Sequence, residues 1–468
     1  MLRTHSCRFA VLLSLAGSLA MLSHGQSFSV QCPKVTALHP ANGGAPGQIK
    51  CQQVSGGDGF ATMADGNQIF LFGFGPLSGL ADIQAGNPGT ETSNIFNKAY
   101  DPSGRAGDPN GALTSVSDIM DTGVMNAESP APTMAIDEDD EFFLTLTNVG
   151  MIMRPDLFEQ HTIHFHGYPN ASSYFDGVPD ASVAINIGGS MTYYYTAPDA
   201  GTYFWHCHIS PPEHLQMGMV GQLYVRPRQD RVTAKQHVYD ALVASNKARG
   251  SSDGLHCSDI LCTGETPAPA SNTASGGLKY AYNDGDGSTQ YDVEYPIQIM
   301  GFDPNFHFVA TTFNPEGFAD MKDKYYLLSG RGYPDTVNTS YISTEGADGK
   351  SRPSQPVRSL IVIDKTNKHN RALLRISDLS VTEFTTLATV GIPMTVIAQD
   401  ARLLRDSLGN NMYYQTNSIT IGGGESADVI LDATNVPKGT YFLYSTNLDH
   451  LSNDAENFGG QMTEIHVQ

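Results

Sequence analysis

The sequence predicts an all-β protein made of two tandem β-sandwich or Greek-key barrel domains, and three observations support this. Only 16% of the 468 residues are charged while 47 are glycine, a balance typical of turn-rich β proteins. Short alternating segments such as 190–197 and 426–433 are separated by Gly, Pro, Asn or Asp, which indicates strands joined by turns. The tetrapeptide Gly-Thr-Tyr-Phe occurs at both 201–204 and 439–442, so one structural pattern is present twice.

The chain divides by composition into a leader, an extension, two domains and a connecting segment. Arg3 and Arg8 precede a short apolar run, and small residues lie before Gln26, as in a secretory signal peptide. This run is too short to be a membrane anchor, and no later segment is long and apolar enough to span a membrane. We therefore expect a secreted or periplasmic protein. The predicted divisions are a signal peptide at 1–25, an N-terminal extension at 26–54, a first domain at 55–228, a linker at 229–284 and a second domain at 285–468.

Charge and cysteine content narrow the class further. A net charge of −21 argues against nucleic acid as a partner, because phosphates need basic patches. An exported protein can form disulfides, and the short spacings predict the pairs Cys32–Cys51 and Cys257–Cys262. Cys207 is then left unpaired in an oxidising compartment, which indicates that its thiol has a specific role.

The segment around Cys207 is rich in metal-binding side chains, and strand geometry sorts them into two sets. Side chains of a strand alternate between its faces, so Cys207 points away from its two histidine neighbours. His161 lies an odd number of positions before His164 and His166, so the same alternation points its side chain to the opposite face from theirs. One predicted set is His161, Cys207, His214 and Met219, and the other is His164, His166, His206 and His208.

The two sets indicate different copper chemistry. Two imidazoles, a thiolate and a weak thioether ligand are diagnostic of a blue-copper electron-transfer site. Zinc is a poorer match, because structural zinc prefers a closed set of Cys and His and a thioether is a poor zinc ligand. Met217 competes with Met219 for the axial position, and Gly218 favours Met219 by letting the backbone turn inward. The all-imidazole set suits copper with open positions for oxygen species or small oxyanions.

Four motifs in the first domain resemble those of multicopper oxidases of the laccase-like family, which are built from cupredoxin domains. They are HTIHFHG (161–167), FDGVP (175–179), GTYFWHCH (201–208) and HLQMGM (214–219). The resemblance implies that His161, Cys207, His214 and Met219 are type 1 copper ligands, and that His164, His166, His206 and His208 are type 2/type 3 ligands and the catalytic residues. It also implies an oxidoreductase that takes electrons from a small-molecule or metal-ion donor and passes them to dioxygen.

Two departures from the family pattern leave other functions open. Cys207 and His214 are seven positions apart where the family usually has five, which is reminiscent of copper nitrite reductases. However, His164 stands where those enzymes have a catalytic aspartate, and His208 is an additional imidazole. The alternatives to an oxidase are therefore a nitrite-reductase-like enzyme and a protein that carries copper or electrons without turnover.

The second domain lacks the copper motifs. Leu443, Tyr444, Ser445 and Thr446 stand where the first domain has WHCH, and 382–394 contains no His-x-His. We therefore expect a metal-free second domain. The resemblance implies eight histidines around a trinuclear cluster, whereas one chain supplies four, so a shared cluster requires a homo-oligomer with identical patches facing across a symmetric contact.

Overall fold

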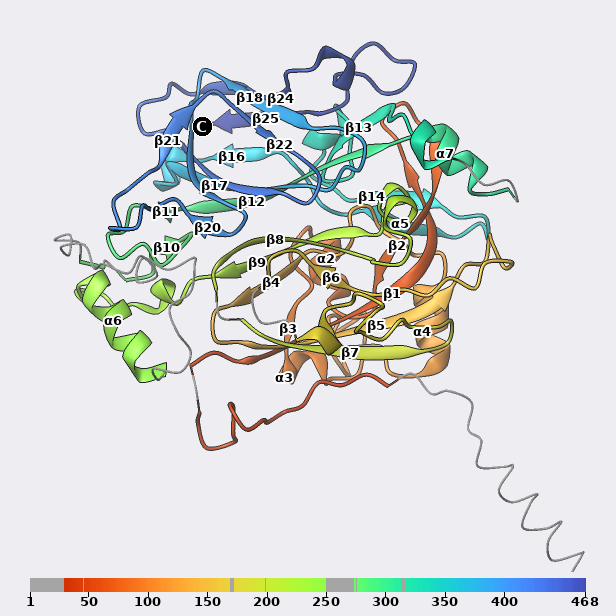
Figure 1. Cartoon of the computed structure of the whole chain (residues 1–468), viewed down its shortest axis with the longest axis horizontal. Coiled ribbons are helices and arrows are strands. Elements are labelled where there is room, and N and C mark those ends of the chain that lie inside the picture. The colour runs from red at the N-terminus through yellow and green to blue at the C-terminus, as the bar shows by residue number, and fades with distance from the viewer. Residues whose placement is uncertain are drawn as a thin grey trace, which may run out of the picture.

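The computed structural model describes residues 29–44, 46–168, 172–197, 199–249, 273–274, 276–312 and 317–468. Strands dominate these residues, and their larger sheets fall into two sets (Figure 1). We call strands β1–β9 with their connections the first unit, and strands β12–β25 with theirs the second unit. The predicted all-β fold is confirmed, whereas the exact domain boundaries stay a prediction.

The first unit is a sandwich of two sheets. One sheet has the order β2 (Gln68–Pro76), β1 (Ile49–Thr62), β5 (Glu141–Gly150) and β7 (Ser190–Thr196), with β3 (Glu91–Thr92) paired to β1. The other has the order β4 (Met134–Asp137), β9 (Val220–Arg226), β8 (Gly201–His206) and β6 (His164–Phe165). Apolar side chains from both sheets, including Phe72, Leu144 and Trp205, form the buried core between them.

The second unit repeats this plan. One sheet has the order β13 (Tyr325–Leu328), β12 (Val293–Phe302), β17 (Arg371–Asp378), β23 (Ser426–Asp432), β19 (Met394–Gln399) and β20 (Arg402–Leu403), with β21 (Tyr414–Thr416) paired to β19. The other has the order β16 (Ile361–Ile363), β25 (Met462–Val467), β24 (Gly439–Ser445), β18 (Thr385–Val390) and β22 (Ser418–Ile421). The two copies of Gly-Thr-Tyr-Phe begin β8 and β24, so the sequence repeat marks equivalent strands.

Short elements fill the connections. The two-stranded sheets are β10 (Lys279–Tyr280) with β11 (Gln290–Tyr291), and β14 (Ile342–Glu345) with β15 (Ser351–Gln355). The α-helices are α2 (Leu80–Gln84), α3 (Ser93–Phe96), α4 (Val116–Gly123), α5 (Pro211–Gln216), α6 (Val238–Arg249) and α7 (Pro304–Val309). The 3₁₀ helices are η1 (Ser173–Phe175), η2 (Arg228–Arg231), η4 (Phe318–Asp320), η5 (Asp335–Val337), η6 (Lys365–Asn367) and η7 (Leu448–His450). Helix α6 lies inside the segment that the sequence predicts as a linker.

The two units share a buried interface along β8 and β9, which lie nearest the second unit in Figure 1. Phe204 and Val220 of the first unit join Met300, Phe302 and Leu379 of the second in one apolar cluster. Burial of this kind holds the units together and brings second-unit loops close to the end of β8.

A charged network also crosses the interface. Glu294 of the second unit accepts hydrogen bonds from Arg226 of the first at 2.7 Å and from Arg375 at 3.0 Å. Burial opposes ionisation of Glu294, but the two guanidinium groups outweigh it and lower its pKa to about 2. The carboxylate is therefore charged at neutral pH and paired on both sides.

The remaining sequence predictions concern disulfides, the signal peptide and membrane-spanning segments. The structure confirms the Cys32–Cys51 disulfide. The Cys257–Cys262 pair and the signal peptide at 1–25 lie outside the described residues. Within the described part of the chain, no helix is long and apolar enough to cross a membrane.

Candidate metal centre

Strand alternation at the end of β8 separates two clusters of metal-binding side chains. His164 of β6 pairs with His206 of β8, and Phe165 pairs with Trp205. The next residue, Cys207, is fully buried and is the one free cysteine among the described residues. Its side chain lies on the opposite face from that of His206, as the alternation predicts.

The first cluster gathers around the Cys207 sulfur. His214 Nδ1 lies 3.2 Å from Cys207 Sγ, and His161 Nδ1 lies 4.0 Å from it. All three residues have no exposed surface, and their ligand atoms lie within 4.8 Å of one another. Thr162 N–H donates a weak hydrogen bond to the same sulfur at 3.4 Å. Three donor atoms thus converge on one buried point.

Helix α5 places His214 beside the cysteine and accounts for the long Cys-to-His spacing. The helix follows Ser210, which has a positive φ of 39°, and it begins with two prolines whose fixed φ suits a first helical turn. Its chain then returns to the sheet, where Met219 N–H donates to His214 O at 2.8 Å and Cys207 N–H donates to Met219 O at 3.1 Å. Gly218, with φ +113°, makes this return possible.

Both methionines of the motif lie in the buried core beside this cluster. Met217 and Met219 have no exposed surface, and both belong to the main apolar cluster of the first unit. The backbone hydrogen bonds tie Met219 to both His214 and Cys207, whereas Met217 O accepts from Phe72 N–H. The assignment of Met219 as the axial ligand stays a prediction.

Electrostatics favour the thiolate form of Cys207. Burial opposes ionisation, but the charges and hydrogen bonds of His214 and His161 outweigh it and hold the pKa of the thiol well below its usual value. Burial likewise lowers the pKa of His214, but Cys207 and Glu159 outweigh it and raise that pKa to about 10. A buried thiolate beside two imidazoles is the donor set that copper prefers in electron-transfer sites.

The second cluster consists of histidines on the other face. Ligand atoms of His164, His166 and His206 lie within 4.8 Å of one another, and the Nε2 atoms of His166 and His206 are 2.9 Å apart. The His208 ring is centred 5.1 Å from the ring of His164 and 5.5 Å from that of His206. The structure therefore brings three of the predicted imidazoles together and places the fourth at their edge.

Hydrogen bonds and burial prepare these imidazoles to bind metal. His164 Nδ1 lies 2.7 Å from the carbonyl of Asp176, and His206 Nδ1 lies 2.6 Å from the carbonyl of Cys207. Each contact fixes one ring nitrogen and leaves the other for a ligand. Burial, with a smaller contribution from the neighbouring histidines, lowers the pKa of His206 to about 3 and that of His166 to about 4. Both rings are thus neutral, which is the form that binds metal.

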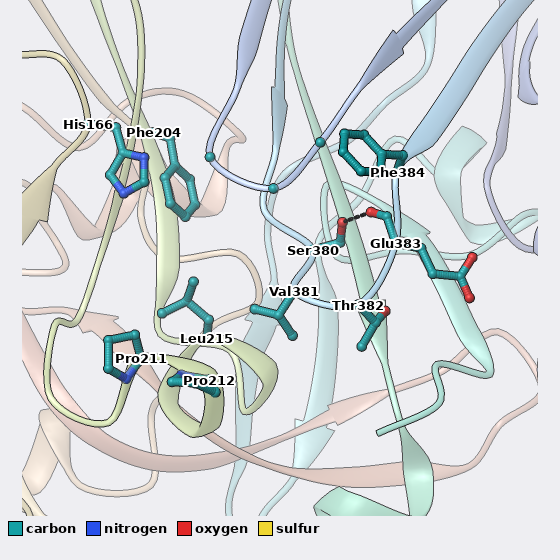
Figure 2. A pocket seen from close by; sticks show the side chains of 13 residues that line it. His166, Phe204, Pro211, Pro212, Leu215, Ser380, Val381, Thr382, Glu383 and Phe384 are labelled. Atoms are coloured by element: carbon teal, nitrogen blue, oxygen red, sulfur yellow. Dashed lines mark hydrogen bonds between the residues drawn. The ribbon is translucent and has the colours of Figure 1, made fainter. Parts of the chain in front are cut away.

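A glycine-rich loop of the second unit closes one side of this cluster. A Cβ atom built on Gly424 would lie 2.8 Å from both Cε1 and Nδ1 of His166, so only glycine fits there. The loop also borders a cavity of about 410 Å³ that reaches His166. Figure 2 shows His166 and Phe204 on one side of this cavity and Glu383 and Phe384 on the other. The sequence motifs did not predict that this loop borders the histidine cluster, although the Gly-Gly-Gly run at 422–424 was a signal for a close backbone approach.

The second unit also holds the loop that carries His214. Gln216, the last residue of α5, donates through Nε2 to Asp323 at 3.0 Å and accepts through Oε1 from Asp303 N–H at 2.8 Å. His307 Nε2 lies 2.9 Å from Gln216 O. Because Gln216 is buried, these contacts fix the end of α5, two residues after His214.

The donor sets and their scaffold define a class of protein. A thiolate between two imidazoles, backed by an all-imidazole cluster on a β-sandwich, is the arrangement of a copper protein of the cupredoxin class. Two sequence profiles described as multicopper oxidase match residues 114–230 and 318–465, which together are more than half of the chain. The chain belongs to the multicopper oxidase family, whose cofactor is copper.

Sequence relatives agree with this assignment, and solved structures agree with the fold. Laccase abr2 of Aspergillus fumigatus is 33% identical over 109 residues, and L-ascorbate oxidase of Cucumis sativus is 33% identical over 113 residues. Each match covers 23% of this chain and only 17% of the relative's length. The blue copper oxidase of Nitrosomonas europaea has a similar fold, with a TM-score of 0.53 and 18% identity over 89% of this chain and 85% of that one. The multicopper oxidase mgLAC gives a TM-score of 0.52 at 16% identity, over 89% and 86% of the two chains.

Proposed function

We propose that this chain is a copper-dependent oxidoreductase that takes electrons from a small-molecule or metal-ion donor and passes them to dioxygen. The observation that carries the proposal is that Cys207, a member of the first site, is adjacent in the chain to two residues of the second. Its sulfur faces His161 and His214, while its backbone continues directly into His206 and His208. Its carbonyl also lies 2.6 Å from His206 Nδ1, which adds a hydrogen-bonded route between the sites.

Each set of residues has a separate task in this proposal. His161, Cys207, His214 and Met219 are the type 1 ligands, and His164, His166, His206 and His208 are the ligands at which the acceptor is reduced. Copper at these positions supplies one-electron redox chemistry, and complete reduction of dioxygen to two waters consumes four electrons and four protons. The protein excludes water from Cys207 by complete burial and keeps the imidazoles of His166 and His206 neutral.

Export and assembly complete the proposal. The charged start and apolar run of residues 1–25 support a signal peptide and a secreted or periplasmic location. His164, His166 and His208 are only partly buried, so one face of the histidine cluster is open. A homo-oligomer that places two such faces together brings eight imidazoles around one site. Two chains that share three coppers and keep one type 1 copper each would hold about 2.5 coppers per chain.

The test is oxygen consumption by the copper-loaded protein with phenols and with cuprous or ferrous ions as donors. We expect turnover with at least one donor, and no turnover by Cys207→Ser, which retains the histidine cluster. Turnover with nitrite and not with dioxygen would identify a nitrite-reductase-like enzyme. Inactivity with every donor and acceptor, in protein that holds its copper, would contradict the oxidase and favour a carrier. Copper per chain in an oligomer of measured mass tests the shared cluster.

A further inference from the structure

The second unit contains a place equivalent to the Cys207 site, and the strand register locates it. In the first unit, Trp205 of β8 pairs with Gly221 of β9. In the second, Leu443 of β24 pairs with Thr463 of β25. Counting from the shared Gly-Thr-Tyr-Phe, Ser445 takes the position of Cys207. Sequence motifs gave no sign of a site here, because the donor residues differ.

The backbone hydrogen bonds around this place are the same in both units. Ser445 N–H donates to Gln461 O at 2.9 Å, as Cys207 N–H donates to Met219 O at 3.1 Å. Gln461 N–H donates to His450 O at 2.8 Å, which matches the 2.8 Å bond from Met219 N–H to the carbonyl of His214. Gln461 therefore stands in the position of Met219, and His450 stands in the position of His214.

The side chains repeat the same geometry. His450 Nδ1 lies 3.2 Å from Ser445 Oγ, the distance that separates His214 Nδ1 from Cys207 Sγ. Ser445 has no exposed surface and His450 has 1%. The other ring nitrogen, His450 Nε2, lies 2.8 Å from a carboxylate oxygen of Glu383. In the first unit, Glu159 lies on the same side of His214, 3.6 Å from Nε2.

The last member of the set comes from β18. Ala388 pairs with Tyr444 of β24, as His164 pairs with His206 of β8. The residue three positions before Ala388 is Thr385, which therefore has the place of His161 and is also buried. The glutamates agree with this alignment, because Glu159 and Glu383 each lie two positions before these residues.

We propose that the second unit keeps the framework of a type 1 metal site in which the donor atoms have been exchanged one for one. Thr385, Ser445 and Gln461 replace an imidazole, a thiolate and a thioether, while the second imidazole, that of His450, is retained. A hydroxyl oxygen is a hard ligand that does not replace the thiolate of a blue site, whereas an amide oxygen can serve as the weak axial ligand, so the thiolate and the imidazole are the donors whose loss matters. The framework would take a divalent ion that accepts mixed nitrogen and sulfur ligands, such as Cu²⁺ or Co²⁺, once the thiolate and imidazole are restored. The correspondence uses the ligand positions proposed for the first unit but does not require turnover.

The test restores the donors in protein that cannot form the first site. The variant Thr385→His/Ser445→Cys/Gln461→Met is made in a Cys207→Ser background and titrated with Co²⁺ and Cu²⁺. We expect one additional metal ion per chain and a thiolate-to-metal charge-transfer band that the Cys207→Ser parent lacks. The matched control adds His450→Ala, which removes the retained imidazole and is expected to remove the band.

Two results would overturn the proposal. One is a folded variant, with the same circular dichroism and thermal unfolding as its parent, that shows no charge-transfer band. The other is a band that survives His450→Ala. Ser445→Cys alone, an exchange of one atom in the same background, is the second variant and is expected to bind Co²⁺ with a weaker band. Failure of this single variant to fold also counts against the proposal, because a preserved framework has to accept a thiol. These spectra do not depend on whether the wild-type protein has oxidase activity, so the failure of one proposal can be told apart from the failure of the other.

Discussion

Replacing Gly424 with alanine tests whether the second unit positions the histidine cluster. Gly424 has φ +89°, where an L-residue is strained by about 1–3 kcal/mol. Its new Cβ would lie 2.8 Å from the His166 ring, whereas ordinary contacts begin at 3.4 Å. The ring must therefore retreat by about 0.6 Å, which exceeds the tolerance of about 0.5 Å within which a metal-binding constellation must be held.

We expect Gly424→Ala to lose copper from the histidine site and to keep the blue absorption of the Cys207 site, which lies on the opposite face of β8. The matched control is Gly66→Ala, because Gly66 has φ +86° and nothing within 4 Å of its added Cβ. Both variants should lose similar stability from backbone strain, and only Gly424→Ala should lose metal. The measurements are denaturant unfolding, copper per chain, and electron paramagnetic resonance of the non-blue copper.

Equal non-blue copper in Gly424→Ala and Gly66→Ala would refute the reasoning. That result would mean that the His166 ring moves without cost, or that the glycine loop does not determine its position. A parallel loss of the blue absorption in Gly424→Ala would also contradict it, because it would show that the two faces of β8 are not independent.

Four further predictions test the metal sites and the interface between the units. Cys207→Ser should abolish the intense visible absorption of the copper-loaded protein, because a hydroxyl cannot replace the soft thiolate; an unchanged spectrum would remove the basis of the blue-copper assignment. Met219→Leu should keep the colour and raise the reduction potential measured by redox titration, and the same behaviour in Met217→Leu instead would transfer the axial assignment. Gln216→Ala should shift the blue band and lower the free energy of unfolding by about 1–3 kcal/mol, because it leaves buried partners on the second unit unpaired; an unshifted band would show that these contacts do not position the loop. The carboxylate of Glu294 has a pKa of about 2 in the folded protein and 4.5 ordinarily, so its contribution of about 3 kcal/mol is present above pH 4.5 and is lost as pH falls toward 2. In Glu294→Gln the free energy of unfolding should therefore depend less on pH over that range. A pH dependence equal to that of the wild-type protein would contradict the ion-pair account.

The sequence predicts the sorting of the metal-binding side chains because that sorting depends only on strand alternation. His161 and Cys207 share one side, and His164 and His206 share the other, as a period of two requires. The repeat of Gly-Thr-Tyr-Phe likewise predicts two sandwiches, since it marks the same strand in each unit.

Other features of the site depend on contacts between distant segments, and local sequence carries little information about them. The approach of Gly424 to His166 joins residues far apart in the chain, and it appears only when the two units pack. Helix α5 begins between Cys207 and His214, where the sequence shows only a spacing longer than the family's usual one. Helix α6, in the predicted linker, has weak amphipathicity, so periodicity gave little signal for it. The choice between Met217 and Met219 depends on side-chain positions within one turn of backbone.

The second unit shows that the residue types of a sequence motif and the backbone arrangement of a site carry different information. A motif search asks for the donor atoms, and 382–394 and 443–446 contain none of the required pattern. The framework instead depends on β24, β25 and the apolar core beneath them, where Leu443 and Ile465 are fully buried. Exchanging a buried thiol for a hydroxyl leaves these strands and their hydrogen bonds in place. The framework can thus be present without the copper donors, because core packing and backbone hydrogen bonds maintain its geometry. His450 lies 3.2 Å from Ser445, and its other ring nitrogen contacts Glu383.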